Sequence, residues 1–334
     1  METSALEYEL PPELIAQRPV ERRDESRLLV YERASGDVRH RRFSELAEEL
    51  SPDELVVVNE TRVIPARLRL RRPGGGEAEV LLLEHVGPDG IWEGLARPSR
   101  RLRPGQRLGP VELLESLGEG RWRLRLEGEP AGEAPLPPYI TQTLDDPERY
   151  QTVYARPPGS AAAPTAGLHF TPALLASLEA AGIRRGSVTL HVGLDTFRPL
   201  EGEYVDEHQI HREWYEIPPS TRVAIDDTKR NAGRVVAVGT TAVRVLETAA
   251  RAQQASGWTD LYITPPYAFR AVDTLITNFH LPRSSLLLLV TAFVQAGMPG
   301  SAPLEARDTL LAAYAAALAE GYRFFSFGDA MLIG

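Results

Sequence analysis

The chain has 334 residues, a formal net charge of −9 and no cysteine. Without cysteine it cannot use disulfides, thiolate zinc sites, iron–sulfur clusters or a cysteine nucleophile. The negative charge argues against indiscriminate nucleic-acid binding, yet residues 62–107 carry ten arginines against five acidic residues. Such a basic region either steers a polyanion to one place or forms a solvated face.

The length predicts about two domains. The first residues lack a basic region followed by an apolar stretch, so they do not form a secretory signal. The longest apolar run, Leu286–Val294, is far short of the ~20 residues that span a bilayer. We therefore expect a cytoplasmic protein without a membrane partner.

Residues 55–62 (LVVVNETR) predict a buried strand, and a different pattern follows it. Residues 62–130 alternate apolar and polar side chains in short runs such as RVIPARLRL and RWRLRLEGE, separated by the turn signals RPGGG, GPDG and LGEG. Short strands at regular spacing without helices are typical of a small antiparallel barrel. We predict an inserted β-barrel domain at residues 61–150, with an exit linker at 134–140.

From residue 151 onward, strands alternate with helices, which predicts an α/β fold with a mostly parallel sheet. We expect one discontinuous α/β domain built from residues 1–60 and 151–334. Thr171 and Pro172 predict a helix start, and Gly182 its end. Ser284 is expected to cap a helix that ends at Gly297. The predicted strands in this part are RGSVTLHV (185–192), GRVVAVG (233–239), DTLITNF (273–279) and YRFFSFG (322–328).

Polar residues follow most of these predicted strands. Ligands of open α/β sheets bind outside the carboxyl ends of the strands. If the strands are parallel neighbours, their ends converge on one crevice, and this convergence is a stronger signal than any single residue. The candidates are Asn59, Arg62, His191, Thr196, Gly239, Thr240, Thr241, Asn278, His280 and Asp329.

Each candidate also has a purely structural interpretation. The Gly239–Thr241 segment is either a helix cap or a cradle for an anion or a ribose. His280 is either a hydrogen-bonded core histidine or a site residue, and Asp329 is either a turn cap or a functional carboxylate. His169 lies between Leu168 and Phe170 just before a predicted helix. It is either packed in the core or faces a ligand at that helix's N-terminus.

A second cluster, in HQIHREWYEI, raises the possibility of a metal site. His208, His211 and Glu213 have suitable ligand chemistry, but the run that follows alternates like a strand and no other metal signature accompanies it. P-loop, dinucleotide-binding and GxSxG motifs are absent from the sequence. Two alternative functions remain. A metal-dependent hydrolase would use the cluster of His208, His211 and Glu213, and a non-catalytic RNA-binding protein would use the arginine-rich region.

Several motifs resemble those of the S-adenosylmethionine:tRNA ribosyltransferase-isomerases of queuosine biosynthesis. They include AAPTAGLHFT, VTLHVGLDTF, VVAVGTTAVRVLE, VDTLITNFHLPRSSLLLLV, YRFFSFGDAMLI, LPPYI and ERYQTVYA. The resemblance runs from Tyr8 to Ile333. Two residues depart from the family pattern: Asp195 and Pro266 stand where glycine is usual, which leaves the local loop geometry and substrate contacts open.

The resemblance implies that the ribosyl part of S-adenosylmethionine is transferred to 7-aminomethyl-7-deazaguanine at the wobble position of tRNA and rearranged. The products are epoxyqueuosine-tRNA, methionine and adenine. It also implies an α/β domain with a β-barrel domain. S-adenosylmethionine is then a co-substrate, and neither a prosthetic group, a metal nor an obligate protein partner is expected; a monomer would suffice.

That chemistry needs a base beside the sulfonium and an acid for departing adenine. The candidates for these roles are His169, His191, His280 and Asp329. The methionine carboxylate would rest at Gly239–Thr241 or near Thr171, and Thr165 and Gly167 would let the backbone approach the ligand. The expected tRNA-binding residues are Arg62, Arg67, Arg97, Arg100, Arg101 and Arg103.

Overall fold

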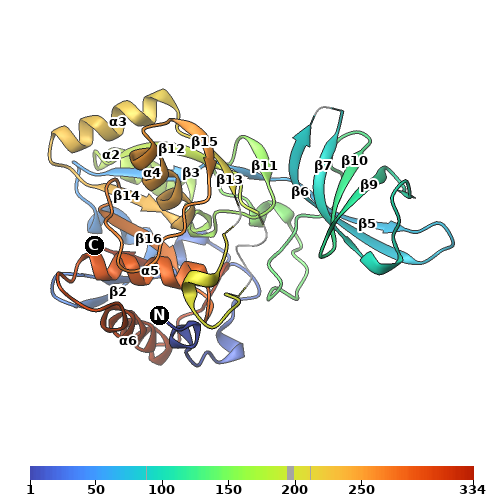
Figure 1. Cartoon of the computed structure of the whole chain (residues 1–334). Helices are drawn as coiled ribbons and strands as arrows, with labels where there is room; N and C mark the ends of the chain where they lie inside the picture. The colour runs from blue at the N-terminus through green and yellow to red at the C-terminus, as the bar shows by residue number, and fades with distance from the viewer. Residues whose placement is uncertain (88, 194–198, 211) are drawn as a thin grey trace.

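The computed structural model describes residues 1–87, 89–193, 199–210 and 212–334. These residues build two separate sheets, each with its own buried core (Figure 1). The larger is a nine-stranded mixed sheet in the order β15-β13-β12-β3-β14-β16-β17-β1-β2. Its strands are β1 (Arg27–Tyr31), β2 (Val38–Arg42), β3 (Leu55–Asn59), β12 (Arg184–Leu190), β13 (Glu213–Glu216), β14 (Val235–Val238), β15 (Ser256–Thr259), β16 (Thr274–Asn278) and β17 (Ala330–Ile333).

The centre of this sheet is parallel, because β12, β3, β14 and β16 all run in one direction. All five residues of β3 are buried: Leu55 and Val57 contribute to one core cluster, and Val56 and Val58 to the other. A strand covered on both faces is apolar throughout rather than alternating. The expected α/β fold is confirmed, with antiparallel strands at both margins of the sheet.

Helices cover both faces of the large sheet, as α/β architecture requires. The predicted caps are present: Thr171 Oγ1 accepts a hydrogen bond from Leu174 N, and Ser284 Oγ accepts one from Leu287 N. No helix of the described segments is long and apolar enough to cross a membrane. The α-helices are α1 (Leu46–Glu49), α2 (Pro172–Ala180), α3 (Pro219–Arg230), α4 (Gly239–Ala252), α5 (Ser285–Ala296) and α6 (Pro303–Ala319).

The smaller sheet is antiparallel and barrel-like, in the order β5-β6-β7-β10-β9-β8. Its core is separate and includes Val80, Leu113, Trp122 and Leu124. A short parallel pair, β4 (Arg62–Val63) with β11 (Pro158–Ser160), lies where the chain leaves and re-enters the large sheet (Figure 1). The strands of the small sheet are β5 (Arg67–Arg71), β6 (Glu77–Gly87), β7 (Ile91–Arg97), β8 (Arg107–Leu108), β9 (Val111–Gly118) and β10 (Arg121–Leu126).

The segment after the barrel-like sheet packs on the N-terminal segment of the chain. Gln17 Nε2 donates to Tyr139 O at 2.9 Å, and Arg18 pairs with Asp145 at 2.7 Å. Ile140 and Tyr150 share a buried cluster with Ala16 and Phe327. The predicted domain boundaries at residues 61 and 150 stay a prediction. The contacts of residues 139–150 with the N-terminal segment bear on where the second boundary lies.

One predicted strand is wrong. Residues 322–328 form a turn rather than a strand, and the strand is the following β17. Phe325 has a φ of +69°, and a Cβ on Gly328 would lie 2.4 Å from the carbonyl oxygen of Arg323. This compact turn buries its three phenylalanine rings, with a single β-bridge from Phe324 to Ile15. β17 then runs antiparallel to β16, so that Ala330 pairs with Asn278.

Candidate functional site

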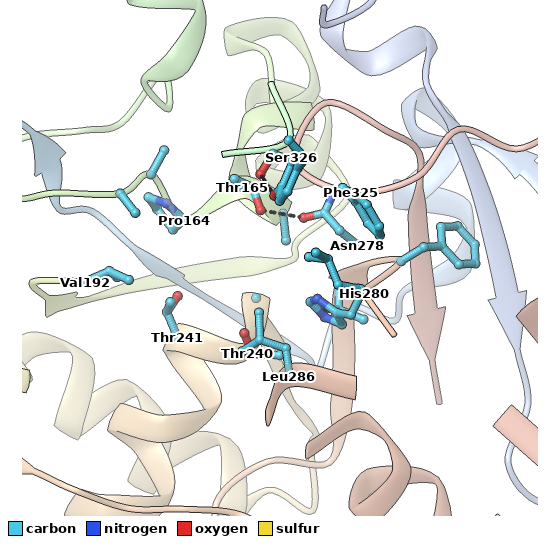
Figure 2. A pocket seen from close by; sticks show the side chains of 18 residues that line it. Pro164, Thr165, Val192, Thr240, Thr241, Asn278, His280, Leu286, Phe325 and Ser326 are labelled. Atoms are coloured by element: carbon cyan, nitrogen blue, oxygen red, sulfur yellow. Dashed lines mark hydrogen bonds between the residues drawn. The ribbon is translucent and has the colours of Figure 1, made fainter. Parts of the chain in front are cut away.

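A small pocket opens at the carboxyl ends of β14 and β16, where the parallel strands of the large sheet end (Figure 2). Its cavity volume is about 40 Å³. The site residues predicted from the sequence that line it are Thr165, Gly239, Thr240, Thr241, Asn278 and His280. Three separate segments of the chain therefore meet at this pocket, as the polar residues after the predicted strands indicated.

One wall of the pocket is the N-terminus of α4. Gly239, the first residue of α4 after β14, adopts a φ of +85°, and no side chain of the described residues caps this end. The first N–H groups of a helix have no intrahelical acceptor and carry the positive end of its dipole. Thr240 is only 6% exposed and lines the pocket, and the buried Thr241 Oγ1 has no hydrogen-bond partner among the described residues. The uncapped wall suits an anionic group.

The opposite wall presents side-chain oxygens (Figure 2). Thr165, the first residue of the short 3-10 helix η7 (Thr165–His169), donates its hydroxyl to Asn278 Oδ1 at 2.8 Å. Tyr139 Oη and Ser326 Oγ lie 2.7 Å apart on the same pocket. Sequence reasoning missed Tyr139 and Ser326, because Tyr139 lies in a predicted linker and Ser326 in a predicted strand.

His280 is the histidine that lines this pocket. It is 7% exposed, its Nε2 lies 2.8 Å from Thr277 Oγ1, and its backbone N donates to Tyr314 Oη. Its Nδ1 has no hydrogen-bond partner among the described residues. Burial lowers the pKa of His280 to about 3, so its imidazole is neutral at ordinary pH.

His169 lies behind the pocket wall rather than on it. Its Nδ1 is 2.7 Å from Ser26 Oγ, its Nε2 is 3.3 Å from Asn278 Nδ2, and its ring stacks on Phe43. Of the two interpretations of this residue, the geometry matches a packed, hydrogen-bonded histidine. It reaches the pocket only through Asn278.

His191 lines a much larger cleft of about 1190 Å³ between the two sheets. Its ring stacks on Trp214 at 5.7 Å, its Nδ1 lies 2.9 Å from Thr61 Oγ1, and burial lowers its pKa. A Cβ on Gly159 would lie 2.7 Å from the His191 ring, so this glycine makes room for it. The cleft and the small pocket share Leu286 as a lining residue.

Three predicted site residues, Asp329, Asn59 and Arg62, make other contacts. Both oxygens of Asp329 accept backbone N–H groups, from Arg27 and Arg323 at 2.9 and 2.7 Å; because its strand was mispredicted, it precedes β17 instead of ending a strand. Asn59 joins the ends of β3 and β12 through Leu190. Arg62 pairs with Glu148.

Gly167 is required by packing, since a Cβ there would lie 2.1 Å from Tyr154 Oη. The helix that begins after Thr171 is already capped, and Thr171 also bonds Asp24. Thr196 and Asp195 lie outside the described residues, and Pro266 follows a cis peptide bond.

The two described members of the candidate metal cluster, His208 and Glu213, make other contacts. Glu213 is buried against Arg244 and also accepts the backbone N–H of Gly193 at 2.9 Å. His208 makes a ring contact with Tyr262, and His211 lies outside the described residues. Over the described ranges, no group of three histidine or acidic side chains could hold a metal ion.

The predicted tRNA-binding arginines lie on the barrel-like sheet. Arg97 ends β7, and Arg100, Arg101 and Arg103 follow in an exposed turn. These four form no ion pair with any described residue, whereas Arg107, Arg123 and Arg125 of the same sheet are paired with glutamates. Arg67 is half-buried beside Glu79.

The fold and the site define an α/β protein with an inserted antiparallel sheet and a small pocket at its strand ends. A family model described as queuosine biosynthesis protein matches residues 3–333. The chain belongs to this family of S-adenosylmethionine:tRNA ribosyltransferase-isomerases.

Individual relatives agree over the whole length. An S-adenosylmethionine:tRNA ribosyltransferase-isomerase from Rubrobacter xylanophilus is 52% identical, with 100% of this chain and 98% of the relative covered. The protein of the same name from Moorella thermoacetica is 51% identical, with both chains fully covered. The crystal structure of S-adenosylmethionine tRNA ribosyltransferase from Thermotoga maritima is 39% identical, with a TM-score of 0.58 over 99% of this chain and 100% of that chain.

Proposed function

We propose that this protein transfers the ribosyl part of S-adenosylmethionine to 7-aminomethyl-7-deazaguanine at the wobble position of tRNA and isomerises it. The products are epoxyqueuosine-tRNA, methionine and adenine. The observation that carries the proposal is the full-length match to enzymes of that name. A tRNA substrate also supports a cytoplasmic location.

The small pocket suits the amino-acid end of S-adenosylmethionine. Its carboxylate would accept N–H groups at the start of α4, where the helix dipole favours an anion. Its ammonium would face the oxygens of Thr165, Asn278 and Ser326 on the opposite wall. Two walls of opposite polarity across one pocket match a zwitterion.

The rest of S-adenosylmethionine would extend into the large cleft, because a cavity of about 40 Å³ has room for only a small polar group. The cleft is lined by the aromatic side chains of Trp92, His191 and Trp214, and aromatic side chains suit stacking with purine-like bases. Adenine and the modified nucleobase are the two such bases in the reaction.

The reaction needs groups that move protons at the junction of pocket and cleft. A base takes a proton from the carbon beside the sulfonium, and the electron pair left there forms a C–C bond to the carbon that loses adenine. Adenine leaves with the electron pair of its glycosidic bond and takes up a proton. The aminomethyl nitrogen forms the new C–N bond by displacing the ribose ring oxygen and releases a proton, and that oxygen closes the epoxide by displacing methionine, which leaves with the electron pair of the C–S bond. We assign proton acceptance to the unpartnered Nδ1 of His280, which is neutral in the free protein.

Release of adenine tests this function directly. The protein is incubated with S-adenosylmethionine and tRNA carrying 7-aminomethyl-7-deazaguanine, and adenine and the modified nucleoside are measured by chromatography. Stoichiometric formation of adenine and epoxyqueuosine supports the proposal. Absence of adenine with this tRNA, or equal release without tRNA, contradicts it.

The exposed arginine turn of the barrel-like sheet is proposed to contact tRNA phosphates. Changing Arg100, Arg101 and Arg103 together to alanine should weaken tRNA binding and lower the salt dependence of log K by roughly 2 to 3, since each phosphate contact contributes ~0.9. S-adenosylmethionine affinity should stay unchanged.

The matched control changes Arg107, Arg123 and Arg125 to alanine, which removes the same charge from arginines already paired with glutamates. Filter binding across a salt series measures both variants. Equal loss of tRNA affinity in the two variants would show a general charge effect and rule out a specific contact.

A further inference from the structure

Four side chains form a hydrogen-bonded chain from the core to the pocket wall. Ser26 Oγ lies 2.7 Å from His169 Nδ1, His169 Nε2 lies 3.3 Å from Asn278 Nδ2, and Thr165 Oγ1 lies 2.8 Å from Asn278 Oδ1. Ser26 and His169 are buried away from the pocket, whereas Asn278 and Thr165 line it. The chain therefore connects the buried histidine to a ligand-facing hydroxyl.

The donors of this chain can be assigned in one direction. Ser26 Oγ donates its proton to Arg23 O at 3.0 Å, so it accepts from His169 Nδ1. His169 Nε2 is then the unprotonated nitrogen and accepts from Asn278 Nδ2. This leaves Asn278 Oδ1 to accept the hydroxyl proton of Thr165. With its proton committed, Thr165 Oγ1 can only accept a hydrogen bond from a ligand.

We infer that His169 is a positioning residue: it holds the Asn278 amide so that Thr165 Oγ1 accepts a hydrogen bond from the ammonium of the S-adenosylmethionine amino-acid end. The inference rests on the proposed function. If the Asn278 amide were reversed, its Nδ2 would face Thr165, and the threonine proton would point at the ligand. A cationic group would then meet a donor instead of an acceptor.

The residues around His169 hold its ring in one position, one charge state and one tautomer. Its side chain is 5% exposed and stacks on Phe43 at 4.9 Å. Burial and, secondarily, the charge of Arg323 lower its pKa to about 3, against the opposing effect of a hydrogen bond with the Arg23 backbone. The ring is therefore neutral at ordinary pH and keeps one tautomer, because each nitrogen has a fixed partner. Because both of its ring nitrogens are engaged and it does not line the pocket, His169 is suited to orientation rather than to proton transfer.

Two amide substitutions at His169 distinguish the contact made by Nδ1 from the contact made by Nε2. In His169→Gln the side-chain amide reaches the position of Nε2 and can still accept from Asn278. In His169→Asn it reaches only the position of Nδ1, so it retains the Ser26 contact and leaves Asn278 Nδ2 without its acceptor. We expect the KM for S-adenosylmethionine to rise at least about tenfold in His169→Asn and to stay within about threefold in His169→Gln, with kcat little changed in both.

Every other outcome of this pair overturns the inference. Loss of kcat in both variants with unchanged KM would make His169 a proton-transfer residue. An equal rise of KM in both variants would indicate packing alone, and wild-type values in both would remove any role. Thermal unfolding of each variant identifies a KM change that comes from lost structure.

A measurement on the wild-type protein tests the donor assignment without a variant. In ¹⁵N-histidine-labelled protein, the His169 ring should show the Nδ1–H tautomer, unprotonated from pH 8 down to pH 5. The Nε2–H tautomer, or protonation within this range, overturns the inference. These outcomes differ from failure of the proposed function, in which the wild-type protein itself releases no adenine.

Discussion

Replacing His280 by glutamine is expected to lower kcat for adenine release by about 10²- to 10⁴-fold, the usual contribution of a general acid or base. Glutamine can keep the hydrogen bond to Thr277 Oγ1 that the imidazole makes through Nε2. It removes the basic Nδ1 that has no partner among the described residues. Binding of S-adenosylmethionine, measured by calorimetry, should change little. The two pocket walls, one at the N-terminus of α4 and one containing Thr165, remain in this variant.

The control for this variant is His40→Gln. His40 is exposed on β2 and contacts Tyr322, and neither residue lines the pocket. Single-turnover assays with modified tRNA compare both variants with the wild type. If His280→Gln keeps wild-type kcat, the assignment of proton transfer to His280 is wrong, whereas a loss confined to KM would make it a binding residue.

Acidification from pH 7 to pH 4 is expected to destabilise the folded protein by about 3 kcal/mol for each of the two buried histidines, His169 and His280. Burial lowers both pKa values to about 3, against an ordinary value of 6.5. The unfolded chain takes up protons as the pH falls below 6.5, while the folded chain does not until near pH 3. Their contribution to stability is therefore complete above pH 6.5 and is lost as the pH falls toward 3.

Urea unfolding at pH 7, 6, 5 and 4 measures this loss. The matched variant is His169→Gln combined with His280→Gln, which removes both titrations and leaves every carboxylate in place. Its free energy of unfolding should fall less steeply with acid than that of the wild type. Parallel curves would show that neither histidine is held neutral by the fold.

Much of the fold could be predicted because local patterns and tertiary packing agree. The apolar run of β3, the alternation in β10 and the caps at Thr171 and Ser284 each have a local cause that the structure retains. Residues 322–328 could not be predicted in this way. Their aromatic side chains are typical of a strand, but they are buried by a turn whose positive φ at Phe325 depends on the surrounding core.

The candidate site could likewise be predicted only in part. Polar residues at the ends of parallel strands predicted the pocket, and Gly239–Thr241, Asn278 and His280 line it. The roles of these residues stay predictions. Tyr139 and Ser326 carry no local signal, because they reach the pocket from a linker and a turn that only the packed chain brings together.

The sequence by itself determined the α/β class, the inserted antiparallel sheet, the helix starts and the family, since these depend on periodicity, capping and local motifs. Only the tertiary structure decided which histidine faces the pocket. His169 and His280 are both buried, and both lie between two apolar residues in the sequence. They differ because Asn278 occupies the space between His169 and the pocket, whereas Nδ1 of His280 has no described partner beside it. That difference depends on which residues surround each side chain in space, and these neighbours cannot be read from the spacing of residues along the chain.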